Sequence, residues 1–126
     1  MIPYNRDIEP PAPFLDMNVE HSTTGQQLSC LAKLDTGADI SAIPMTVAEQ
    51  LRLLPVRVIS VEGYENKPMP VPTYAVALNV ANARFRMEVT VIAEPYALLG
   101  RDVLNYFYAR LNGPDLTFDL SLSASR

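Results

Sequence analysis

The chain reads Asp35-Thr36-Gly37-Ala38-Asp39 directly after a largely apolar run of five residues. The apolar run predicts a β-strand, which puts the carboxylate of Asp35 at the end of a strand. Thr36 supplies a hydroxyl beside that carboxylate, and Gly37 has no Cβ to keep another backbone or a substrate away. A carboxylate in this setting is a candidate catalytic group, although the same residues also suit an ordinary polar turn.

A second segment ends in Leu99-Gly100-Arg101-Asp102, some sixty residues further along the chain. It lies between an alternating strand pattern and a predicted helix that runs from about Arg101 to Phe107. Asp102 is a candidate N-cap of that helix, because aspartate is among the residues preferred at that position. Together the two segments resemble the signature segments of the retropepsin-like aspartic proteases, the family of the retroviral proteases and their single-domain cellular relatives.

The resemblance implies a mainly β fold, a closed β-barrel or sandwich that forms a single lobe with one or two short helices and acts as a homodimer. It covers about residues 14–120, which we assign to a retropepsin-like aspartic protease domain. Residues 1–13 contain four prolines and are predicted to form an extended N-terminal arm. Residues 121–126 are assigned to a C-terminal tail.

The pattern of side chains predicts the individual elements of this domain. Thr46 and Glu49 match a capping box, which predicts a short helix that stops before Pro55. The segment Ala81-Asn82-Ala83 is predicted to join two long strands in a tight hairpin. Alternation of apolar and polar residues predicts strands at 15–20, 27–34, 56–61, 73–80, 84–91 and 116–120.

Peptide hydrolysis by carboxylates requires two of them around one water. Two like charges so close cannot both ionise, so they share a proton, and one acts as base while the other acts as acid. The chain contains one Asp-Thr-Gly triplet, so a complete site requires a symmetric homodimer in which Asp35 of each copy meets on the two-fold axis. The resemblance assigns Asp35, Thr36 and Gly37 to the catalytic loop, with Thr36 bonding across the axis.

The resemblance also implies a set of residues that bind the peptide substrate. Ala38 and Asp39 would contact it from the catalytic loop, and Asp39 would form a structural ion pair with Arg101. The retroviral enzymes close a glycine-rich flap over the substrate, whereas the corresponding stretch here contains a single glycine, Gly63. Tyr64 is a candidate substrate contact in this flap, and the alternative is an exposed loop tyrosine.

The sequence does not decide which surface joins the two copies. Leu116, Phe118 and Leu120 form one apolar face of the last predicted strand, which either joins the partner or belongs to the core of the monomer. The proline-rich start cannot pair as a regular central strand. An assembly that differs in detail from the viral one is therefore expected.

The composition limits the remaining possibilities. The chain has 126 residues, a net charge of −4 and no basic block, which disfavours a nucleic-acid partner. It contains no apolar stretch of membrane-spanning length and no signal-peptide pattern, so a cytoplasmic location without membrane association is expected. One histidine and one cysteine cannot build a zinc site of these ligands, and hydrolysis by two carboxylates needs no metal or organic cofactor.

The sequence therefore predicts an aspartic endopeptidase that cleaves peptides or proteins as a homodimer. Two alternatives stay open. The first is a catalytically silent dimeric module of the same fold that binds peptides, since a fold does not by itself imply a function. The second is an unrelated small β-domain with a structural or assembly role.

Overall fold

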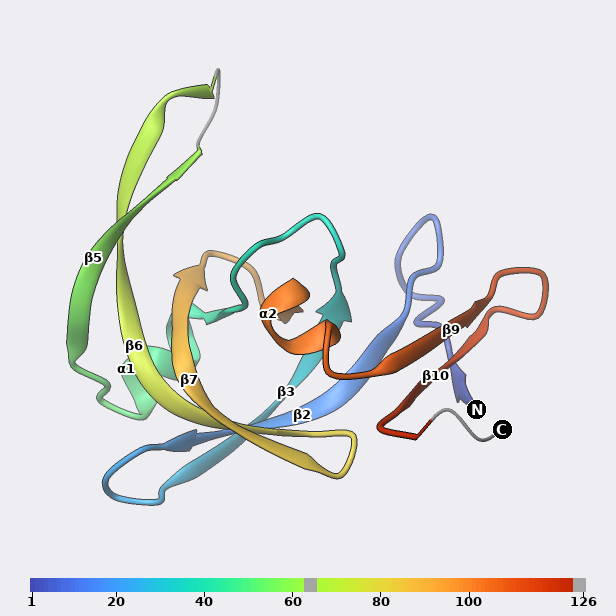
Figure 1. Ribbon diagram of the computed structural model, residues 1–126, viewed down its shortest axis with the longest axis horizontal. Helices are drawn as coiled ribbons and strands as arrows, with labels where there is room; N and C mark the ends of the chain where they lie inside the picture. Colours follow the sequence, from blue (N-terminus) through green and yellow to red (C-terminus); the bar gives the residue numbers. More distant parts are fainter. Residues whose placement is uncertain (63–65, 124–126) are drawn as a thin grey trace.

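The computed structural model describes residues 1–62 and 66–123, and β-strands predominate in it (Figure 1). The mainly β prediction is therefore confirmed. The helices are α1 (Met45–Gln50) and α2 (Arg101–Leu104). The strands are β1 (Ile2–Pro3), β2 (Phe14–His21), β3 (Gln27–Leu34), β4 (Ala42–Pro44), β5 (Pro55–Glu62), β6 (Pro68–Val80), β7 (Ala83–Ile92), β8 (Ala97–Leu99), β9 (Tyr108–Asn112) and β10 (Thr117–Ser121).

Within the described residues, six strands close into a barrel in the order β2-β3-β8-β4-β7-β6, because β2 pairs with both β3 and β6. The pairs β3–β8 and β4–β7 are parallel, and the long β6–β7 hairpin is antiparallel. Ala81 and Asn82 both have positive φ, at 49° and 63°, as a two-residue hairpin turn requires. The interior is apolar, with Val19, Ile43 and Leu99 fully buried.

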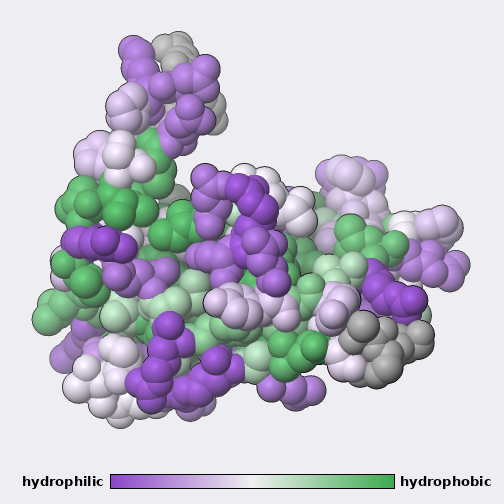
Figure 2. Space-filling model, in the orientation of Figure 1, coloured by the Kyte–Doolittle hydropathy of each residue, from purple (hydrophilic) through white to green (hydrophobic). Residues whose placement is uncertain are grey.

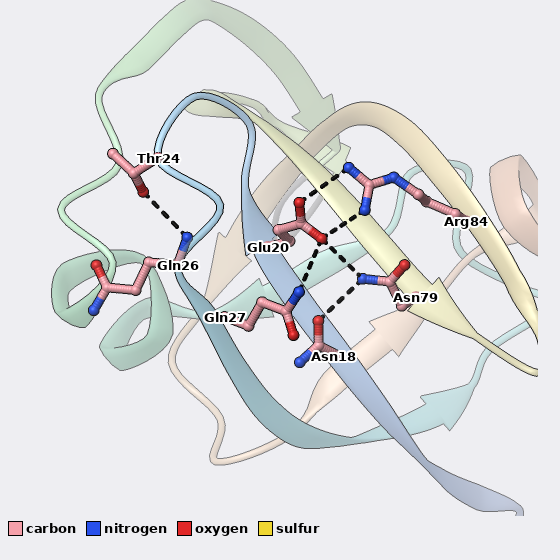
Figure 3. A network of polar contacts seen from close by, with 7 residues as sticks. All are labelled: Asn18, Glu20, Thr24, Gln26, Gln27, Asn79 and Arg84. Atoms are coloured by element: carbon pink, nitrogen blue, oxygen red, sulfur yellow. Dashed lines mark hydrogen bonds and ion pairs between the residues drawn. The ribbon is translucent and has the colours of Figure 1, made fainter.

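A polar network stabilises the region where β2 pairs with β6 and closes the barrel (Figure 3). Arg84 on β7 donates to both carboxylate oxygens of Glu20 on β2, at 2.6 and 3.0 Å. Asn79 on β6 donates to Glu20 at 3.4 Å and to Asn18 at 3.0 Å. The hydrogen bonds from Arg84 hold the pKa of Glu20 below its usual value, against the opposing effect of burial. The network therefore joins β2 to the β6–β7 hairpin, which lies some sixty residues further along the sequence.

The predicted capping box is wrong. Helix α1 begins at Met45, its N-cap is Pro44, and no side chain caps it. Pro44 is the last residue of β4, so the chain passes from strand to helix without a turn, and Thr46 lies inside the first helical turn. Tertiary pairing of β4 with β7 has thus fixed the start of the helix instead of the local capping pattern.

Strands β5 and β6 extend beyond the barrel as a long hairpin (Figure 1). This hairpin occupies the place of the predicted flap, and the candidate residues Gly63 and Tyr64 lie outside the described residues. Figure 2 shows apolar residues gathered along the part of the hairpin nearest the barrel. They include Leu54, which precedes β5, together with Val56 and Val58 on β5 itself.

A smaller sheet is formed by the two ends of the chain, in the order β1-β10-β9. The proline-rich start contributes the short strand β1, which pairs with β10 through Ile2 and Phe118. Phe118 is fully buried and packs against the ring of Tyr4, with centroids 6.1 Å apart. The face of β10 that carries Phe118 therefore belongs to the core of the monomer, which is one of the two alternatives that the sequence left open. Among the described residues, no helix has the length and apolar character needed to cross a membrane.

Candidate active site

The topology of the barrel explains why the two signature segments meet. Strands β3 and β4 are not neighbours, because β8 lies between them. The loop that leaves β3 at Leu34 must therefore cross the end of β8 before it reaches β4. Asp35 makes the first contact of this crossing, since its backbone N–H donates to the carbonyl of Leu99 at 2.9 Å.

The carboxylate of Asp35 is oriented by its own turn. Its Oδ1 accepts the N–H of Gly37 at 3.0 Å, and its backbone carbonyl accepts the N–H of Ala38 at 3.2 Å. A Cβ at position 37 would lie 3.2 Å from Oδ1, so glycine is the residue that fits here without pressure on the carboxylate. Within the described part of the chain, Oδ2 of Asp35 has no hydrogen-bond partner, and it is free to act on a substrate or a water.

Arg101 locks the loop onto the start of α2. Its Nη1 donates to the carbonyl of Thr36 at 2.6 Å, its backbone N–H donates to the carbonyl of Ala38 at 2.9 Å, and its Nη2 pairs with Oδ1 of Asp39. The ion pair between Asp39 and Arg101 that the sequence predicts is thus present. The side chains are 84% and 45% exposed respectively, so the charge attraction itself contributes little to stability. Its main consequence is the fixed shape of the loop.

A buried hydroxyl that the sequence did not reveal completes this junction. Ser41 is 1% exposed, and its Oγ donates to Oδ1 of Asp102 at 2.7 Å while it accepts the N–H of Gly100 at 2.9 Å. The backbone N–H of Ser41 also donates to Oδ2 of Asp102 at 2.9 Å. Asp102 is therefore not the N-cap of α2, as predicted, since Gly100 takes that position and Asp102 lies in the first turn. The only sequence signal was a hydroxyl residue in an otherwise apolar segment.

Gly100 is required by the crossing of the loop over β8. A Cβ at this position would lie 2.8 Å from the carbonyl oxygen of Ala38 and 3.1 Å from the carbonyl carbon of Ile40. Real Cβ atoms are essentially never found within 3.0 Å of such an atom, so a larger residue would push the loop away. The glycine of the second signature segment thus sets how closely the loop that carries Asp35 lies against α2.

The other predicted site residues of this loop lie next to Asp35 in the chain. Thr36, Gly37 and Asp39 are exposed on the loop beside Asp35, and Ala38 is half-buried against Arg101. Figure 2 shows this loop as a hydrophilic area in the middle of the visible face. Among the described residues, no group of three or more histidine, cysteine or acidic side chains is arranged to hold a metal ion.

No family model and no curated protein matches the sequence. Solved structures do match the fold, and one is the solution structure of the simian foamy virus (mac) protease, with a TM-score of 0.53 and 18% identity over 73% of this chain and 93% of that one. The EIAV protease in complex with the inhibitor HBY-793 matches with a TM-score of 0.55 and 20% identity over 75% and 86%. The foamy viral protease-reverse transcriptase in complex with an RNA/DNA hybrid matches with a TM-score of 0.56 and 20% identity. This chain spans 12% of that larger protein.

These likenesses establish that the fold is retropepsin-like. The match covers about three quarters of the chain at low identity, so it defines the architecture and not the chemistry.

Proposed function

We propose that the protein is an aspartic endopeptidase that cleaves peptide bonds as a homodimer, with Asp35 of each copy in one shared site. The observation that carries this proposal is the setting of Asp35, whose Oδ1 is held by Gly37 while Oδ2 has no partner among the described residues. The neighbouring carboxylates are engaged elsewhere, Asp39 by Arg101 and Asp102 by Ser41. A second copy is therefore the source of the second free carboxylate.

The proposed reaction uses the two carboxyl groups in opposite protonation states. The ionised Asp35 takes a proton from a water, whose oxygen attacks the carbonyl carbon of the scissile bond. The protonated Asp35 of the partner copy donates its proton to the carbonyl oxygen. When the resulting gem-diol collapses, one of its hydroxyl groups gives a proton back to the Asp35 carboxylate of the partner copy. The C–N bond breaks, and the leaving nitrogen receives the proton that the first Asp35 took from the water. Since one shared proton is needed, activity should follow a bell-shaped pH profile.

The small sheet offers a surface on which two copies could pair. Tyr4 donates its N–H to the carbonyl of Leu116 at 2.8 Å, so alternate residues of β10, including Phe118, direct their backbone groups toward β1. Leu111 lies opposite Phe118, and its N–H and C=O therefore point to the open side of β9. The edge also exposes apolar side chains, since Leu111 is 60% and Tyr108 is 55% exposed. We propose that two copies of β9 pair along this edge.

The Asp35→Asn substitution tests the catalytic assignment. We expect it to lower the rate of cleavage of unfolded casein by about 10²–10⁴-fold, the usual effect of losing a general acid or base. Asp16→Asn is the matched control, because Asp16 is exposed on β2 away from the loop. Cleavage that persists in Asp35→Asn would refute the assignment, and a folded dimer without cleavage in either form would favour the peptide-binding module.

The dimer surface is tested by sedimentation velocity. Leu111→Glu places a charge on the open edge and should shift the protein to monomer with loss of activity. Leu54→Glu is the control, since Leu54 is 81% exposed near the base of the β5–β6 hairpin. A Leu111→Glu protein that dimerises as well as the unchanged chain would rule out pairing along β9.

A further inference from the structure

A groove of about 730 Å³ lies beside β7, adjacent to the catalytic loop. One wall is β7 itself at residues 84–88, and the opposite wall contains Asp39, Ile40 and Tyr106. The rings of Phe85 and Tyr106 meet with centroids 5.4 Å apart and join the two walls. The volume lies within the range of about 300–1,000 Å³ that is typical of ligand sites.

Along this groove, the edge of β7 that faces away from β6 has no partner strand among the described residues. Strand β4 pairs with β7 only from Thr90 to Ile92, so the preceding residues have β6 on one side and, within the described chain, no strand on the other. Thr90 donates its N–H to the carbonyl of Ser41 at 3.1 Å, and Ser41 directly precedes β4. The backbone groups of Thr90 therefore face away from β6. Since alternate residues of a strand face the same side, the N–H and C=O of Arg86 and Glu88 face the groove. The groove thus has both donors and acceptors for an added strand.

The free edge of β6 on the β5–β6 hairpin is different. Thr90 donates from Oγ1 to the carbonyl of Pro72 at 3.0 Å, so Pro72 directs its backbone away from β5. Pro68 and Pro70 share that direction by alternation, and proline has no N–H to donate. The prolines therefore block strand addition at that edge, which is a common role of proline on exposed edge strands. The β7 edge carries no such block.

The charges around the groove favour an acidic partner. Oε1 of Glu88 accepts a hydrogen bond from the Thr73 hydroxyl at 2.7 Å and another from Nε of Arg57 at 2.8 Å. These hydrogen bonds lower the pKa of Glu88, and the bond from Thr73 has the larger effect. Arg84 is held by both oxygens of Glu20.

The acidic residues of the opposite wall are also engaged, Asp39 by Arg101 and Asp102 by Ser41. Arg86 is exposed and has neither a hydrogen bond nor an ion pair among the described residues. It is therefore the charged group of the groove that is left to bind a ligand, and it is a cation.

We propose that this groove binds an extended acidic peptide segment, which pairs as an added strand with Arg86 and Glu88 of β7 and places a carboxylate against the Arg86 guanidinium. Because Asp39 lies at the groove, we assign the segment to the substrate chain beyond the catalytic loop, and this assignment rests on the proposed function. The mode is strand addition, in which backbone bonds give affinity and side chains give selectivity. Substrates with an acidic segment some distance from the cleaved bond are then preferred.

The experiment uses the Asp35→Asn protein, so that binding is measured without cleavage. The probe is a short fluorescein-labelled peptide of alternating valine and glutamate, followed by fluorescence anisotropy. We expect Arg86→Gln to raise its Kd about two- to fivefold, the size expected of an exposed ion pair, and Arg86→Glu to raise it further. Arg52→Gln, an exposed arginine at the end of α1, is the matched control and should leave the Kd unchanged. A lysine peptide should bind weakly.

Backbone pairing is tested separately on the same protein. Two versions of the peptide are N-methylated at alternate residues, and only one version should lose binding, because only one set of N–H groups faces β7. The amide hydrogens of Arg86 and Glu88 should exchange more slowly when the peptide is bound. Equal binding of both methylated peptides, or an Arg86→Glu protein that binds as before, would overturn the proposal.

The link to the substrate is tested in the active protein. An acidic extension on a cleaved peptide should lower KM, and Arg86→Gln should remove that advantage while kcat stays unchanged. An extension that has no effect on KM would overturn the assignment of the segment to the substrate. If the unchanged protein cleaves nothing, the proposed function fails, while the anisotropy result on Asp35→Asn still decides whether the groove binds acidic strands.

Discussion

The Gly100→Ala substitution is the sharpest test of how the loop that carries Asp35 is held. The added Cβ would lie 2.8 Å from the carbonyl oxygen of Ala38 and 3.2 Å from that of Ile40. Both are backbone atoms of the loop, so neither can rotate out of the way as a flexible side chain could. Overpacking of this kind costs about 1–3 kcal/mol. The carbonyl of Ala38 also accepts the N–H of Arg101 at 2.9 Å, and losing that bond costs about 0.5–1.5 kcal/mol more.

We therefore expect Gly100→Ala to lower the free energy of unfolding by about 1.5–4.5 kcal/mol, the sum of these two effects. The measurement is urea denaturation at one protein concentration, because association would otherwise shift the midpoint. Gly113→Ala is the matched control, since a Cβ there meets nothing within 4 Å. If both variants lose less than about 0.5 kcal/mol, the level of an ordinary surface change, the close approach at Gly100 does not constrain the loop.

Three further outcomes follow from contacts away from Asp35. Ser41→Ala leaves the buried N–H of Gly100 without its acceptor and should lower the free energy of unfolding, measured in urea, by about 1–3 kcal/mol. Ser29→Ala is the control because Ser29 is exposed, and equal losses in the two variants would contradict the prediction. The lowered pKa of Glu20 stabilises the fold above its ordinary pKa of 4.5, and this contribution is lost as the pH falls through the folded-state value. Urea denaturation in acid should thus show a steeper loss of stability in the unchanged protein than in Glu20→Gln, and parallel curves would refute it. Burial raises the pKa of the Cys30 thiol to about 11, so native protein at mildly alkaline pH should react with iodoacetamide at least about a hundredfold more slowly than urea-unfolded protein, and similar rates would exclude this burial effect.

Local patterns were enough to predict the long hairpin of the barrel. Residues 73–80 and 84–91 alternate because one side of each strand faces an apolar interior, and the pairing of Val80 with Ala83 places the turn where the sequence indicates it. The position of Asp35 at the end of β3 was also predictable from the apolar run. The ion pair between Asp39 and Arg101 depended instead on the family resemblance, because nothing local connects residues so far apart.

The remaining features depend on tertiary contacts that no local pattern contains. Strand β9 was missed because its residues are mostly exposed, and without a buried face there is no alternation to detect. The role of Ser41 follows from the order β3-β8-β4, which brings it against Gly100. The buried position of Phe118 likewise follows from its pairing with β1, a strand that the proline content of the N-terminal arm did not suggest.

The loop that carries Asp35 and the groove beside β7 have one structural cause. After Asp35 the chain crosses the end of β8, and it first pairs with β7 at Ala42. One edge of β7 at residues 84–88 therefore stays without a partner strand near Asp39, while the other edge pairs with β6. A longer β4 would close the groove, but it would also shorten the crossing that holds Asp35 in place. The fold therefore places the half-buried Asp35 close to an open strand edge, which is the arrangement that the proposed peptide binding requires.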